Sequence, residues 1–182
     1  NKGLNVGYIA QENALDEDKT IWDEMLTVFD NLIEKNKRIT KMQEQIAEHP
    51  EDEDLLKRYD QLAYDFEQEG GFTYQAEIKS ILNGFNFKEN TWQKVIGTLS
   101  GGEKTRLAFV KLLLQKPPVL LLDEPTNYLD LDTLDWLEAF LKNYQGAIIT
   151  VSHDQYFLDH LANQIFELNF GKLTTFKGNY SQ

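Results

Sequence analysis

The 182-residue sequence contains no cysteine, only four prolines and three histidines. Without cysteine, disulfide bonds and thiolate metal sites are excluded, and the composition fits a reducing compartment. No uninterrupted apolar run approaches the ~20 residues that a membrane-spanning helix needs. The histidines are too few and too scattered to indicate a zinc site. We therefore expect a protein without a disulfide scaffold, a zinc centre or a membrane segment.

Basic side chains are scarce in one part of the chain. The net charge is −12, and residues 12–70 hold 18 acidic side chains against 7 basic ones, whereas the rest of the chain holds 12 and 11. Affinity for nucleic-acid phosphates comes mostly from lysine and arginine, so broad polyanion binding by residues 12–70 is not expected. The segment has one local basic cluster, made of Lys35, Lys37, Arg38 and Lys41.

Apolar residues in the acidic segment recur at helical spacing. Before the break at His49-Pro50 they are Ile21, Met25, Val28, Leu32, Ile39, Met42 and Ile46, and after it Leu55, Tyr59, Leu62 and Phe66. Steps of three, four and seven indicate a coiled-coil-like seam, with Lys35 at the one skipped position. Proline ends the first helix, and Gly70-Gly71 ends the second. The pattern predicts an antiparallel helical hairpin that projects roughly 30–40 Å, at ~1.5 Å per residue.

The rest of the chain alternates apolar runs with amphipathic segments. We expect strands at Val6–Ala10, Val119–Leu122 and Ala147–Val151, helices at Tyr74–Leu82, Glu103–Gln115, Leu134–Tyr144 and Tyr156–Ala162, and a final hairpin of Ile165–Leu168 with Leu173–Phe176. Continuous apolar runs are typical of parallel strands that are buried on both faces. Alternating strands and helices predict an α/β fold with a parallel sheet.

Polar side chains follow two of the expected strands. Asp123 and Glu124 come after the first, and Ser152-His153-Asp154 comes after the second. Ligands of open α/β sheets bind at the carboxyl ends of strands. An aspartate there can hold hydrated Mg²⁺, a glutamate can polarise a water, and a histidine can bind a phosphate oxygen. The alternative is an acidic turn and a surface histidine. His160, seven residues after His153, is interpreted as structural.

The stretch GTLSGGEKT, residues 97–105, differs from a phosphate-binding loop because Glu103 stands where that loop has lysine. Ser100 and Glu103 instead fit a capping box at the start of a helix. A well-capped helix needs no glycines in its first turn, where Gly101 and Gly102 weaken it. Glycines there suit a backbone that must be approached closely, and a helix N-terminus attracts anions. We interpret the stretch as a phosphate-docking helix end; a capped helix without a ligand is the alternative.

Three ordered motifs, LSGGE at 99–103, VLLLDEPTNYLD at 119–130 and SHD at 152–154, resemble those of ATP-binding-cassette ATPases. The resemblance implies bound ATP and Mg²⁺. It makes LSGGE the signature motif and assigns the remaining roles as follows: Asp123 to Mg²⁺, Glu124 to the catalytic base, Asp130 to the D-loop, His153 to the switch histidine, and Gln11 to the Q-loop residue that senses Mg²⁺ and the γ-phosphate.

Two features resemble those of the ABC-F branch. They are Asn127-Tyr128 after DEPT and the expected helical hairpin before the signature. That resemblance implies a soluble, cytoplasmic translation factor with two cassettes, which acts at the ribosomal tRNA exit site or protects ribosomes from antibiotics. The hairpin would be the arm, which in this family contacts ribosomal RNA, protein L1 or exit-site tRNA. The basic cluster could touch RNA or could be a solvated face of Glu–Lys pairs.

The resemblance implies a partial ATP-binding-cassette fold, and it divides the chain into four parts. Residues 1–12 would hold a strand and the Q-loop, 13–70 the arm, 71–116 the helical subdomain with the signature, and 117–182 the α/β core. No G-x-x-x-x-G-K-[ST] motif occurs. We therefore expect a fragment of a first cassette, with the Walker A loop before Asn1 and a second cassette elsewhere in the same chain.

ATP in this family lies between two cassettes. The chain would give Ser100, Gly101 and Gly102 to one site, and Gln11, Asp123, Glu124 and His153 to another. Glu103 and Asp130 are further expected ATP-binding residues. Because it has no phosphate cradle of its own, we expect the isolated chain to bind ATP weakly without hydrolysing it. The main alternative is the nucleotide-binding subunit of an ABC transporter. Repair ATPases with much longer coiled coils, and a purely structural α/β domain, fit less well.

Overall fold

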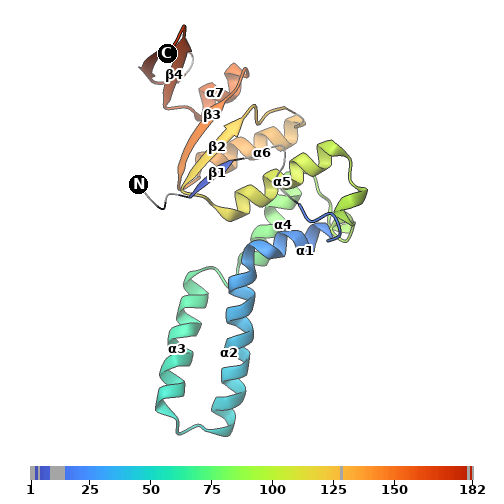
Figure 1. Ribbon diagram of the computed structural model, residues 1–182, viewed down its shortest axis with the longest axis vertical. Helices are drawn as coiled ribbons and strands as arrows, with labels where there is room; N and C mark the ends of the chain where they lie inside the picture. Colours follow the sequence, from blue (N-terminus) through green and yellow to red (C-terminus); the bar gives the residue numbers. More distant parts are fainter. Residues whose placement is uncertain (1–2, 4, 9–14, 128, 180, 182) are drawn as a thin grey trace.

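The computed structural model describes residues 3, 5–8, 15–127, 129–179 and 181. It contains an α/β layer, a helical part beside that layer, and a long helical hairpin that projects from the helical part (Figure 1). The mixed α/β class and the projecting hairpin agree with the expectations from the sequence. Among the described residues, no helix combines the length and the apolarity that a bilayer crossing requires.

The parallel sheet has the order β1-β2-β3, formed by Val6–Tyr8, Val119–Asp123 and Ala147–Val151. The central strand β2 buries Leu120 and Leu122, which lie on one of its faces, whereas Val119 and Leu121 on the other face are only partly buried. Strand β3 was expected to be buried too, and this was wrong: Ile149 and Val151 are more than half exposed. The exposed residues alternate with the partly buried Ile148 and Thr150, so the described residues leave one face of β3 uncovered.

The helical part and the sheet share one hydrophobic core. Its main elements are α1 (Ile21–Leu26), α4 (Tyr74–Gly84), α5 (Gly101–Gln115), α6 (Leu131–Lys142) and α7 (Gln155–Leu161), with short 3₁₀ turns at Glu89–Thr91 and Ile96–Thr98. Trp22 stacks on Trp92 at 5.3 Å between ring centroids. Gly84 lies so close to Trp136 that an added Cβ would be 2.3 Å from its ring. Helix α5 contributes Leu107, Val110 and Leu113, all fully buried, to this core.

The hairpin consists of α2 (Asp30–Glu48) and α3 (Glu53–Gln68), which run antiparallel (Figure 1). Leu32, Ile39 and Phe66 form its small separate core, as the apolar seam predicted. The expected single helix from residue 21 is interrupted by a 3₁₀ turn at Thr27–Phe29. The part before this turn does not project, because Ile21 and Met25 are fully buried in the main core. The projecting part of the chain therefore begins after this turn, with α2.

The C-terminal hairpin consists of β4 (Gln164–Asn169) and β5 (Lys172–Lys177), paired antiparallel as predicted. Phe170 and Gly171 make the turn with positive φ angles of 46° and 76°. The hairpin lies at the end of the molecule opposite the arm (Figure 1). Its large apolar side chains are exposed, and Phe170 is 99% exposed.

Candidate functional site

Asp123 and Glu124 lie at the carboxyl edge of the sheet, beside the end of β3. Asp123 pairs in register with Val151, and the backbone N–H of Glu124 donates to the Val151 carbonyl at 2.8 Å. Glu124 has a φ angle of 45°, in the left-handed region that non-glycine residues rarely adopt. This turn leaves Asp123 exposed and directs the Glu124 carboxylate toward the residues that follow β3.

The Glu124 carboxylate contacts His153. The backbone N–H of His153 donates to Oε2 at 3.2 Å, and its Nε2 lies 3.5 Å from Oε1. The Oε1 atom is buried but accepts no hydrogen bond from the described residues. A buried acceptor without a donor is costly, so this atom fits a site that a water molecule or another donor completes. The structure thus brings together Asp123, Glu124 and His153, as the strand-end pattern predicted.

The edge of the sheet offers few side chains that could bind a metal ion. Among the described residues, no group of three or more histidine, aspartate or glutamate side chains could hold a metal ion. Mg²⁺ commonly keeps several waters and takes only one or two protein carboxylates together with substrate phosphates. Asp123, exposed beside Glu124, fits that kind of ligand. Gln11, the other expected ligand, lies outside the described residues.

The signature end of α5 is closed by the predicted capping box. Glu103 Oε2 accepts from the Ser100 N–H at 2.8 Å and from its hydroxyl at 2.7 Å, and Ser100 Oγ accepts from the Glu103 N–H at 3.3 Å. The backbone and side-chain hydrogen bonds from Ser100 lower the pKa of Glu103. An added Cβ on Gly101 or Gly102 would meet no atom within 4 Å. Internal packing therefore gives no reason for glycine at either position.

Asp130 has a structural role that the sequence did not reveal. Its Oδ1 accepts from the Thr133 N–H at 2.8 Å and caps α6, while Oδ2 accepts from the Asn86 side chain at 3.0 Å. These hydrogen bonds lower the pKa of Asp130, and the one from the Thr133 backbone has the largest effect. Among the described residues, no hydrogen bond or ion pair joins Asp130 or Ser100 to Glu124 or His153. The expected site residues therefore form separate groups.

Asn86, the partner of Asp130, was missed because it lies 44 residues away in the sequence. Its positive φ angle of 64° just after α4 is a local feature that asparagine tolerates. The ion pairs of Lys104 with Glu17 and of Lys111 with Glu24, each across 87 residues of sequence, were missed for the same reason. Local patterns show which residues can cap or turn, but they do not show which distant segment is their partner.

Comparison with known proteins agrees with this geometry. The family model described as ABC transporter matches residues 2–127. The chain is 46% identical to YdiF of Bacillus subtilis, 35% to ABC transporter F family member 5 of Arabidopsis thaliana, and 37% to the energy-dependent translational throttle protein EttA of Mycobacterium tuberculosis. Each match covers at least 98% of this chain but only 26–32% of the relative.

The fold is also that of a solved cassette. A structure described as the ATP binding subunit of an ABC transporter superposes with a TM-score of 0.62 at 16% identity, covering 95% of this chain and 59% of that one. The relatives include F-type proteins. The chain belongs to the ABC transporter family of ATP-binding cassettes.

Proposed function

We propose that this chain supplies parts of two ATP sites in an F-type ATPase that acts on the ribosome. The observation that carries the proposal is the contact of His153 with Glu124 at the β2–β3 edge, together with the buried Glu124 Oε1, which accepts no hydrogen bond from the described residues. That atom is a suitable acceptor for the proton of an attacking water. A carboxylate in this position acts as a general base.

The residues of the edge would divide the work of hydrolysis. Glu124 would orient the water and take its proton, and His153 would contact a phosphate oxygen from its exposed ring. Asp123 and Gln11 would hold Mg²⁺ through the waters around it. When bound, Mg²⁺ would supply positive charge to the phosphate oxygens. Asp130, fixed by Thr133 and Asn86, would set where the chain leaves this edge.

The Ser100 end of α5 would serve the other ATP site. Gly101 and Gly102 leave the first turn uncovered, so their N–H groups, which the capping box does not use, would be open to a phosphate held by a second cassette. Glu103 remains bound to Ser100 and keeps the helix end formed. Because no phosphate-binding loop occurs in these residues, the isolated chain should bind ATP weakly and release no phosphate. Micromolar affinity by calorimetry would contradict this.

The proposed partner is the ribosome at its tRNA exit site, as a housekeeping translation factor or as an antibiotic-resistance factor. The name of EttA, a translational throttle protein, supports a role in translation. The arm would reach ribosomal RNA, protein L1 or exit-site tRNA. Of its basic cluster, Lys35 is already paired with Glu69 at 2.5 Å, and Lys37 lies 3.8 Å from Glu34. Arg38 and Lys41 are exposed and have no ion pair among the described residues, so they are the better candidates for RNA contacts.

The test is co-sedimentation with ribosomes. It uses the Glu124→Gln variant of the proposed two-cassette protein that contains this chain, called the longer protein below. With ATP the variant should remain bound, because ATP binds but is not cleaved, and with ADP it should be released. Asp135→Asn, which removes an exposed carboxylate from α6, is the matched control and should behave as the parent. Recovery with a membrane fraction instead of ribosomes would favour the transporter subunit.

A second experiment separates the arm from the ATP sites. Charge reversal at Arg38 and Lys41 should weaken ribosome binding and flatten its dependence on salt, since phosphate contacts release counterions. Charge reversal at Lys35 tests the paired lysine of the same helix and should have a smaller effect on the salt slope. An unchanged slope in the Arg38 and Lys41 variant would mean that this face is only solvated.

A further inference from the structure

Helix α5 carries two lysines that pair with carboxylates near the base of the arm. Lys104 Nζ lies 2.7 Å from Glu17 Oε1, and Lys111 Nζ lies 2.6 Å from Glu24 Oε1. Lys104 and Lys111 are seven residues apart, which is about two turns, so they lie on one face of the helix. Glu24 lies on α1, and Glu17 lies just before it. Two ion pairs therefore hold one face of the signature helix to the segment that leads into the arm.

Glu24 is the buried member of this arrangement. Its side chain is 2% exposed, and Oε1 also lies 3.4 Å from the backbone N–H of Asp16, while Lys19 Nζ lies 3.9 Å from Oε2. A buried carboxylate is tolerated where cations and N–H donors surround it, and it becomes costly when they are removed. The Glu24–Lys111 pair is thus a fixed connection rather than an exposed, exchangeable one.

The backbone connects the same two segments. Gly97 N–H donates to the Glu17 carbonyl and Ile96 N–H to the Lys19 carbonyl, both at 2.9 Å. In the other direction, Ile21 N–H donates to the Lys94 carbonyl at 3.0 Å. Residues 94–97 lie shortly before Ser100, and residues 17–21 lead into α1, which the turn at Thr27–Phe29 joins to the arm helix α2. The start of the signature and the start of α1 are therefore held in one hydrogen-bonded unit.

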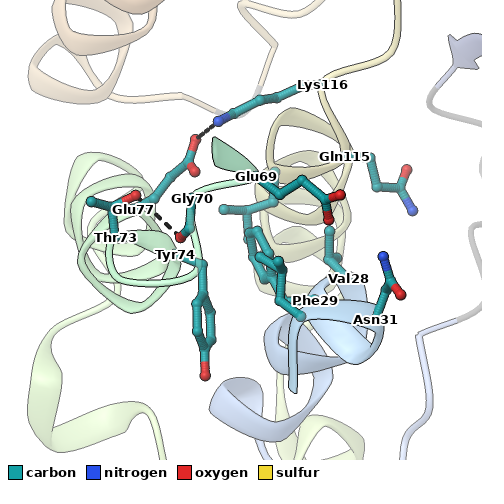
Figure 2. A pocket seen from close by; sticks show the side chains of 12 residues that line it. Val28, Phe29, Asn31, Glu69, Gly70, Thr73, Tyr74, Glu77, Gln115 and Lys116 are labelled. Atoms are coloured by element: carbon teal, nitrogen blue, oxygen red, sulfur yellow. Dashed lines mark hydrogen bonds and ion pairs between the residues drawn. The ribbon is translucent and has the colours of Figure 1, made fainter. Parts of the chain in front are cut away.

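The C-terminal end of α5 is also buried in the main core, through Leu112, Leu113 and Leu114. A cavity of about 250 Å³ lies there between the arm base, α4 and the end of α5. Figure 2 shows Val28 and Phe29 from the arm base, Tyr74 and Glu77 from α4, and Gln115 and Lys116 around it. The ion pair at this end, Glu77 to Lys116 at 2.6 Å, joins α5 to α4 and not to the segment before the arm. The ion pairs that join α5 to the segment before the arm therefore lie on the side of Glu17 and Glu24.

We propose that Glu17 and Glu24 are positioning residues, which make the arm base and the signature helix move together. A displacement of the arm by its partner would then shift the Ser100 end of α5, and a shift of that end would move the arm. The consequence for hydrolysis rests on the proposed function, whereas the mechanical connection does not. The two are tested by separate measurements.

The connection can be measured in this chain by double electron–electron resonance. The sequence has no cysteine, so labels at Glu44→Cys on α2 and Thr105→Cys on α5, both exposed positions, are unique. The parent should give one narrow distance distribution. Glu17→Gln, Glu24→Gln and their combination should broaden it, whereas Glu77→Gln, which removes the ion pair at the other end of α5, should leave it narrow.

An unchanged distribution in the double variant would overturn the proposal, and so would equal broadening in Glu77→Gln. Should Glu24→Gln not fold, Glu17→Gln decides, because the Glu17 side chain is 63% exposed and its loss leaves no buried charge. Exchange of the charges, Glu24→Lys with Lys111→Glu, should restore part of the narrow distribution. Failure of the exchange together with an unchanged Glu17→Gln distribution would count against the connection.

The catalytic consequence is measured by ATP turnover in the longer protein. The Ser100 end would contact phosphate only when two cassettes close, so Glu24→Gln should lower kcat about five-fold or more with KM changed less than about two-fold. Glu77→Gln should keep both parameters. Equal loss in both variants would mean general weakening of α5. If Glu124→Gln leaves turnover intact, the proposed function fails, while the resonance result still decides the connection.

Discussion

Glu124 and His153 contact each other through two different parts of the histidine. The backbone N–H donates to Glu124 Oε2 at 3.2 Å, and the ring Nε2 lies 3.5 Å from Oε1. The first contact survives any substitution that keeps the backbone in place, whereas the second needs the ring. The orientation of Glu124 and the chemistry of the imidazole can therefore be separated by mutation.

Glu124→Gln should lower ATP turnover in the longer protein by about 10²–10⁴-fold, because the amide cannot accept the proton of water. His153→Ala should cause a smaller loss, since the backbone contact still orients Glu124. Steady-state phosphate release measures both rates. A His153→Ala loss as large as that of Glu124→Gln would contradict this prediction, because it would show that the reaction needs the ring as much as the carboxylate.

Gly101→Ala and Gly102→Ala should each stabilise the isolated chain slightly, by up to about 0.5 kcal/mol, because alanine is the better helix former and the added Cβ meets open space. The same changes should slow turnover in the longer protein. Gly84→Ala should instead destabilise the chain by about 1–3 kcal/mol, since its Cβ would clash with Trp136. Urea unfolding measures these differences, and a destabilising Gly102→Ala would contradict the assignment of an open helix end.

The lowered pKa of Asp130 makes part of the stability depend on pH. Hydrogen bonds from Thr133 and Asn86 favour the carboxylate in the folded state, so its contribution is present above the unfolded pKa, about 4, and is lost as pH falls through the lower folded value. Asp130→Asn removes this contribution. The difference in Tm between parent and variant should be largest near neutral pH and should shrink toward pH 3. A difference that stays constant over this range would contradict the prediction.

The exposed apolar face of the β4–β5 hairpin should make the isolated chain self-associate. Leu168 and Phe170, at 74% and 99% exposed, are its most accessible large side chains. Burial of such surface between copies is favourable by about 25 cal/mol per Å². Sedimentation velocity should show a concentration-dependent rise in mass for the parent and less of it for Leu168→Asp with Phe170→Asp. Equal association in both proteins would point to another surface.

The local structure could be predicted from the sequence where one segment determines it. The capping box at Ser100, the arm helices and the C-terminal hairpin depend on spacing within a few residues, and all are present. The carboxyl edge with Asp123, Glu124 and His153 was also predictable, because parallel strands place their ends together. The roles of these residues in ATP binding and hydrolysis stay predictions.

The remaining features depend on contacts between distant segments. The helix from Ile21 was expected to continue into the arm, but burial of Ile21 and Met25 in the main core requires a change of direction, which the turn at Thr27–Phe29 provides. Lys35 stood out as part of a basic cluster, yet it is neutralised by Glu69, 34 residues away. Periodicity identifies an apolar face but not the core in which that face is buried.

A rotation at the short turn Thr27–Phe29 would be amplified along the arm. Helix α2 has 19 residues, and a helix of this size is about 28 Å long at ~1.5 Å per residue. A rotation of about 10° at the turn would move the tip by roughly 5 Å, about one helical turn. An adjustment at the base that is small enough to preserve the packing of α1 would thus be magnified at the far end. Conversely, a force that a bound partner applies at the tip would exert a large torque at the turn, because the tip lies far from it.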